Sequence, residues 1–180
     1  LDALEQLGVR GECTKGNGCP PIVIDTEGLP GGKAHIRGDI SSQFLSGLLM
    51  AAPFAQSTVT LQLDTPLVSV PYVTMTERVM QAFGVQVIHT TDTTYQVESG
   101  QPYQGTTYNI EPDASAASYF WAAAAIAGGH VTVQGLTPDA LQGDVAFCEC
   151  LQLMGCGVQY MDHGIQVTGG SLQGITIDMN

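Results

Sequence analysis

The sequence predicts an α/β (α+β) protein built from repeated units, with mixed sheets that carry helices on one side. Composition is the first indication: 44% of the 180 residues are hydrophobic and 12% are charged, as in folded globular chains. An internal repeat is the second, because a glycine follows a helix-like segment at Gly8, Gly84 and Gly155. These glycines lie 76 and 71 residues apart. Each copy is therefore long enough to be a supersecondary unit that packs on its neighbours.

The same order of elements is expected in each copy. A short strand should follow each glycine, and a second strand should come at 21–25, 95–98 and 165–168. Third strands are expected at 34–37, 107–110 and 175–178. Helices capped by Asp39 and Asp113 should come next, each followed by a strand that begins at Val59 or Val131. The unit then reads α-β-β-β-α-β in this frame.

The stretch 38–52 predicts an amphipathic helix with polar groups at its start. Ser41 and Ser42 are good helix-capping residues, and Gln43 adds a carboxamide. Phe44 and Leu48 recur behind them at helical spacing and would face a core. Free amides and the helix dipole favour an anion at such a start. The stretch therefore predicts either a plain helix cap or a site for a phosphate or carboxylate.

A second polar position precedes the next helix. Ser69 stands where an N-cap would, and Pro71 suits the first helical turn. Tyr72 offers a hydroxyl in that turn, so the pair is either a cap with a core tyrosine or part of a site. The matching helix of the second copy, 118–126, is apolar almost all round and is expected to be buried.

Charge and apolar runs argue against two classes of partner. The net charge is −12, with five basic residues against 17 acidic ones, so nucleic acid is not expected as a partner. A phosphorylated ligand would need cations from elsewhere. No apolar run approaches the roughly 20 residues of a membrane span, so no membrane partner is expected. The chain opens without Met inside a helix-like pattern, which suggests a piece of something longer.

The cysteines predict reduced, packed thiols. Their number, five, is odd, and no secretory signal is visible, which favours a cytoplasm-like compartment. Zinc-type spacing is absent, so no metal is expected and no cysteine is assigned as a nucleophile.

Three stretches in this order resemble the family of 5-enolpyruvylshikimate-3-phosphate synthase (EPSP synthase, 3-phosphoshikimate 1-carboxyvinyltransferase). They are 38–45 (GDISSQFL), 67–72 (LVSVPY) and 113–120 (DASAASYF). The resemblance covers essentially all 180 residues and identifies the chain as a central fragment. It implies β-α-β-α-β-β units of a two-lobed inside-out barrel, incomplete here. It also implies transfer of the enolpyruvyl group of phosphoenolpyruvate to the 5-hydroxyl of shikimate-3-phosphate, without a cofactor, in the shikimate pathway of aromatic amino acid biosynthesis.

The resemblance also implies roles for particular residues. Ser41 and Ser42 match contacts to the phosphate of shikimate-3-phosphate, and Ser69 and Tyr72 match further contacts to it. Gln43 matches an amide that reaches both substrates. The family's catalytic acids and its lysine and arginine clusters match no stretch of this chain. No catalytic residue is therefore assigned, and the 180-residue chain alone is predicted to be inactive.

The same resemblance predicts how the chain is divided into lobes. Residues 1–111 would belong to the first lobe, on the shikimate-3-phosphate side, and 112–180 would be the first unit of the second lobe. Expected partners are the two substrates, the missing segments of the parent chain and a second copy of the fragment. The expected location is the cytoplasm, or a plastid in a plant.

Two alternatives remain open from the sequence. One is a non-catalytic binding or assembly module that reuses the repeat, and the other is the related enolpyruvyl transferase acting on UDP-N-acetylglucosamine. Sequence on both sides of this stretch would separate them.

Overall fold

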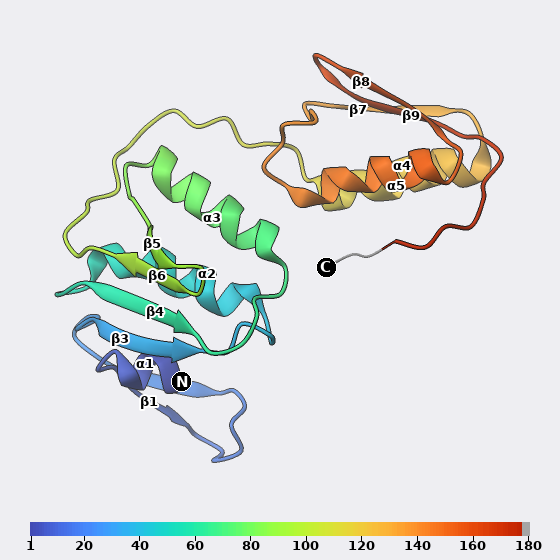
Figure 1. The fold of residues 1–180 in the computed structure, drawn as a ribbon. Coiled ribbons are helices and arrows are strands. Elements are labelled where there is room, and N and C mark those ends of the chain that lie inside the picture. Colours follow the sequence, from blue (N-terminus) through green and yellow to red (C-terminus); the bar gives the residue numbers. More distant parts are fainter. Residues whose placement is uncertain (178–180) are drawn as a thin grey trace. The chain divides into compact units, whose positions relative to one another are not determined.

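The protein, described here by a computed structural model that covers residues 1–177, has two compact units (Figure 1). The first is Leu1–Thr107 and the second is Tyr108–Asn180. Each unit has its own hydrophobic core. Among residues 1–177 no helix is long and apolar enough to cross a membrane.

A four-stranded mixed sheet forms the centre of the first unit, in the order β3-β4-β6-β5 (Figure 1). Its strands are β3 (Gly32–Ile36), β4 (Val59–Leu63), β5 (Ile88–Thr91) and β6 (Thr94–Val97). β3 and β4 run parallel, with Ile36 opposite Leu63, and the other pairs are antiparallel. The short helix α1 (Asp2–Gln6) precedes a separate antiparallel pair, β1 (Arg10–Cys13) and β2 (Ile22–Asp25).

Two helices cover this sheet and pack against each other. They are α2 (Ser42–Ala51), which continues into the 3-10 turn η1 (Ala52–Phe54), and α3 (Val70–Ala82). The side chains of β4 alternate, so that Val59, Leu61 and Leu63 are buried while the intervening side chains are only partly covered. The helices add buried side chains to the same cluster, namely Leu45, Leu49, Val73 and Met80. This packing fixes where the N-termini of α2 and α3 lie.

In the second unit, two helices lie along one face of an antiparallel sheet with the order β7-β9-β8 (Figure 1). The helices are α4 (Ala114–Ala127) and α5 (Phe147–Leu153), the latter preceded by the 3-10 turn η2 (Gly143–Ala146). The strands are β7 (His130–Gln134), β8 (Gly157–Met161) and β9 (Gly164–Thr168). Trp121 is fully buried in this core, and its Nε1–H donates to the carbonyl of Ile165 at 3.3 Å.

The expected third strand at 107–110 is wrong, because this segment pairs with no strand within residues 1–177. Ile110 is 87% exposed, and Pro112 just beyond it has no N–H to give to a ladder. The equivalent stretch 175–177 is not a strand either, and residue 178 lies outside the described residues.

Three expectations about helices also need correction. Phe44 of α2, expected to face the core, is 55% exposed. The cap of α2 is Ser41, whose Oγ accepts from the N–H of Gln43 at 3.2 Å, whereas Asp39 hydrogen-bonds Arg37 and Thr65. The helix 118–126, now part of α4, is buried along only one side. Tyr119 and Ile126 on its other side are more than three-quarters exposed.

Candidate functional site

All five residues predicted as ligand contacts line one cavity of about 380 Å³ in the first unit. One wall is the start of α2, with Ser41, Ser42 and Gln43, and the other is the start of α3, with Ser69 and Tyr72. The two helix starts meet because their helices pack side by side on the same sheet.

The Ser42 side chain is available to a ligand. Ser42 is only 5% exposed, yet no side chain or backbone group within residues 1–177 forms a hydrogen bond with its hydroxyl. Nearly buried hydroxyls are normally paired, so one that lines a cavity without a protein partner is suited to a ligand contact. The Ser41 hydroxyl differs, since it caps Gln43 N–H.

The start of α3 carries backbone strain. Ser69 has φ 55° and ψ 46°, and it is the one non-glycine in residues 1–177 with a positive φ. That left-handed conformation costs a serine roughly 1–2 kcal/mol. Its side chain makes no capping hydrogen bond, so capping does not repay the strain. Strained residues of this kind concentrate at functional sites.

Three lining residues were not predicted: Ser46, Met75 and Thr76. The hydroxyls of Ser46 and Thr76 lie 2.9 Å apart and join α2 to α3. Ser46 follows Ser42 by four residues and Thr76 follows Tyr72 by four, so each shares a helix face with a predicted contact. That spacing was the signal that could have found them.

The lining holds many hydroxyls but no cation. Among the described lining residues there are five serine or threonine hydroxyls and one carboxamide, and neither Lys nor Arg. Such a set can hydrogen-bond phosphate oxygens but cannot neutralise them.

A second, larger cavity of about 630 Å³ lies between α1, the end of β3 and α2. Gln43 lines both cavities, so two ligands could approach this one residue. His35 and Asp64 also line it and form a pair at 2.7 Å between Nδ1 and Oδ1.

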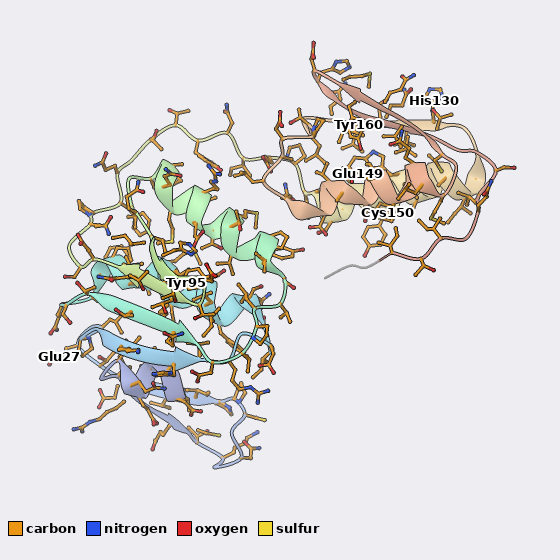
Figure 2. All side chains as sticks on the ribbon, viewed as in Figure 1. Glu27, Tyr95, His130, Glu149, Cys150 and Tyr160 are labelled. Carbon is orange, nitrogen blue, oxygen red and sulfur yellow. The ribbon has the colours of Figure 1, made fainter. Side chains whose placement is uncertain are left out.

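Cysteine and metal chemistry find no support in the described residues. No group of three or more His, Cys, Asp or Glu within residues 1–177 could hold a metal ion. Cys148 and Cys156 are buried, and Cys19 is exposed. Burial, with smaller effects of Cys150 and Glu149, raises the pKa of the Cys148 thiol to about 12, so it stays protonated at neutral pH. Figure 2 labels Glu149 and Cys150 on α5.

Fold and site together define the class, an α/β chain of repeated units with a hydroxyl-lined pocket at paired helix starts. The family model for EPSP synthase (3-phosphoshikimate 1-carboxyvinyltransferase) matches residues 1–180. The chain belongs to the EPSP synthase family.

Relatives of known name support this membership. The chloroplastic 3-phosphoshikimate 1-carboxyvinyltransferase of Brassica napus is 46% identical over 98% of this chain and 36% of the relative. The 3-phosphoshikimate 1-carboxyvinyltransferase of Sulfurovum sp. is 42% identical over 100% of this chain and 42% of the relative. The solved EPSP synthase from Acinetobacter baumannii matches with a TM-score of 0.71 at 25% identity, over 96% of this chain and 40% of that one. The chain thus spans about two fifths of the length of each of these three proteins.

Membership also decides between the alternatives left open by the sequence. The family model and these relatives carry the name of the shikimate enzyme, and neither the assembly module nor the UDP-N-acetylglucosamine enzyme is favoured.

Proposed function

We propose that this chain is a central part of a transferase that moves the enolpyruvyl group of phosphoenolpyruvate to the 5-hydroxyl of shikimate-3-phosphate. The observation that carries the proposal is the convergence of Ser41, Ser42, Gln43, Ser69 and Tyr72 on one cavity in a chain of this family.

The cavity suits the phosphate end of shikimate-3-phosphate. The Ser42 hydroxyl would donate to a phosphate oxygen, and the dipole at the start of α2 would favour the negative charge. Ser41 would also contact the phosphate, and Ser69 and Tyr72 would complete the contacts to shikimate-3-phosphate. Gln43, which borders both cavities, would reach shikimate-3-phosphate and phosphoenolpyruvate together.

This chain would supply substrate binding, and other segments of the full-length enzyme would supply the catalytic groups. Transfer needs a proton donor to the methylene carbon and a base for the 5-hydroxyl, each within hydrogen-bond reach. The described residues of the pocket offer neither, nor any cation for two phosphorylated substrates. The 180-residue chain alone should therefore bind shikimate-3-phosphate weakly and show no turnover.

The proposal includes the division into lobes and the location. Residues 1–111 would form part of the lobe that holds shikimate-3-phosphate, and 112–180 the first unit of the other lobe. The enzyme would work in the cytoplasm, or in a plastid if its source is a plant. The Brassica napus relative is named as chloroplastic.

The test uses a full-length protein in which flanking segments like those of the relatives surround these 180 residues. Ser42→Ala removes one hydrogen bond to a charged group, a loss on the order of 1.5–3 kcal/mol. We expect the dissociation constant for shikimate-3-phosphate, measured by calorimetry, to rise at least tenfold. Gln43→Ala should weaken the binding of both substrates and should also lower kcat.

Ser115→Ala is the matched control, because Ser115 is an exposed serine in the first turn of α4 in the other unit. It should change neither affinity nor kcat. If Ser42→Ala lowers the melting temperature but leaves the affinity for shikimate-3-phosphate unchanged, Ser42 is only structural and the site assignment fails.

A further inference from the structure

The hydroxyl of Thr65 connects the segment that leads into α2 with the segment that leads into α3. It accepts from the N–H of Gly38 at 2.9 Å and of Asp39 at 3.1 Å. It donates to Oδ1 of Asp39 at 2.8 Å. One donor and two acceptor positions are all that a hydroxyl has, so every hydrogen-bonding position of Thr65 is used on the opposite segment.

Arg37 holds the Asp39 carboxylate in place for this bond. Its Nε–H donates to Oδ1 at 3.1 Å and its terminal nitrogen to Oδ2 at 2.8 Å, a bidentate geometry. The pairing has a second consequence. Asp39 lies two residues before Ser41, where an uncompensated carboxylate would repel a phosphate, and Arg37 compensates its charge.

The backbones of the two segments are also in close contact. Val68 N–H donates to the Gly38 carbonyl at 3.0 Å. A Cβ at Gly38 would lie 2.8 Å from the Thr65 carbonyl oxygen, so position 38 has no room for a side chain. Pairing of β3 with β4 brings the segments together as far as Ile36 and Leu63, and the contacts of Thr65 continue beyond the sheet.

We propose that Thr65, with Asp39 and Arg37, is a positioning residue that sets the separation between the two walls of the pocket. We call these three residues the Thr65 clamp. Asp39 precedes Ser41 by two residues and Thr65 precedes Ser69 by four, so any shift between the segments moves the two sets of hydroxyls apart. This inference rests on the proposed function of the pocket.

Two substitutions of Thr65 in the full-length protein test the clamp. Thr65→Val keeps the shape and removes the hydroxyl, while Thr65→Ser keeps the hydroxyl. We expect Thr65→Val to raise the dissociation constant for shikimate-3-phosphate about tenfold, because a phosphate bound from two walls is sensitive to their spacing. The dissociation constant of Thr65→Ser for shikimate-3-phosphate should stay within about threefold of that of the unsubstituted protein. Equal affinities of the Val variant and the parent protein overturn the proposal.

Thr94→Val is the matched control for loss of a threonine hydroxyl. Thr94 is nearly buried in β6, donates to Oε1 of Gln62 at 2.7 Å and does not line the pocket. It should lower the melting temperature and leave the affinity for shikimate-3-phosphate unchanged. If Thr94→Val weakens the binding of shikimate-3-phosphate as much as Thr65→Val does, both substitutions act through general stability and the positioning role is wrong.

A double-mutant cycle gives a readout that a purely structural role would not move. Once Ser69→Ala has removed a contact on the α3 wall, Thr65→Val should weaken binding by less than its single effect. Full additivity would mean that Thr65 does not act through that wall. Should Thr65→Val fail to fold, Arg37→Gln replaces it, since the Arg37 side chain is 63% exposed. Arg37→Gln should also weaken the binding of shikimate-3-phosphate, and an unchanged affinity counts against the clamp.

The outcomes separate this inference from the proposed function. If Ser42→Ala and Ser69→Ala weaken the binding of shikimate-3-phosphate while Thr65→Val does not, the positioning role of the clamp is wrong and the site assignment stands. If none of the three changes affinity, the site assignment and the clamp are both wrong.

Discussion

Asp39 is an acidic residue beside a pocket proposed for a phosphorylated ligand, and its surroundings keep it charged. Hydrogen bonds from Arg37 and then from Thr65 lower the pKa of Asp39 from its usual 3.8 to about 2. A carboxyl with a lowered pKa stabilises the folded state when it is ionised. That contribution is present above about pH 4 and is lost as the pH falls toward 2.

We therefore predict that the Asp39 carboxyl titrates near pH 2 in the folded protein. In Thr65→Val and in Arg37→Gln the midpoint should move up toward 3.8, because each variant removes hydrogen bonds that favour the ionised form. Carboxyl chemical shifts measured by NMR against pH would follow this. A midpoint near 3.8 in the unsubstituted protein would mean that the clamp is not formed in solution.

At the same scale, the sequence predicted the candidate contacts but not their convergence on one cavity. Capping residues before amphipathic runs, together with the family resemblance, were enough to select Ser41, Ser42, Gln43, Ser69 and Tyr72. No local pattern places Ser69 opposite Ser42, because that depends on packing between two helices. The Thr65 clamp was out of reach for the same reason, since it depends on the parallel pairing of β3 with β4.

Among the elements, the two repeated helices begin in different ways. Ser41 caps α2 from the wall of the pocket, whereas Asp113 caps α4 by accepting from the N–H of Ala116 at 2.9 Å. The sequence predicted Asp113 as the cap of this helix, and the structure confirms it.

Asp113→Ala should cost about 1 kcal/mol in the free energy of unfolding, because a first-turn amide loses its acceptor and the helix dipole loses a favourable charge. Ser115→Ala should stay within about 0.5 kcal/mol of the parent, as is usual for exposed surface positions. Urea denaturation of both variants, followed by circular dichroism, measures the difference. Equal losses would contradict the assignment of Asp113 as the cap.

The strands show why local patterns predict some elements better than others. Those at 21–25, 34–37 and 165–168 were predicted within one or two residues because each has a hydrogen-bonding neighbour in this chain. Residues 107–110 have an equally good strand pattern, but they pair with no strand in the described part of the chain. A strand needs a partner as well as a pattern, and the sequence of a segment says nothing of its partner.

At the scale of the whole molecule, the chain spans only part of its relatives' length. It carries exposed apolar side chains on α4. The exposed side of α4 carries Tyr119, Phe120 and Ile126, which are 78%, 61% and 79% exposed. They recur at helical spacing with the small Ala123 between them, as on a helix face that packs against another helix. Exposed apolar faces of this kind favour association.

We predict that the 180-residue chain self-associates at micromolar concentration, with the exposed face of α4 in the contact. Its net charge of −12 opposes association, so added salt should strengthen it by screening. Phe120→Lys combined with Ile126→Lys should shift the chain toward monomer in sedimentation velocity. Lysine makes the net charge less negative, so weaker association could not come from greater repulsion. Gln81→Lys, at an exposed polar position of α3, is the control and should leave association unchanged. A monomeric parent chain at all salt concentrations, or equal effects of the control and the double variant, would show that this face is not the contact.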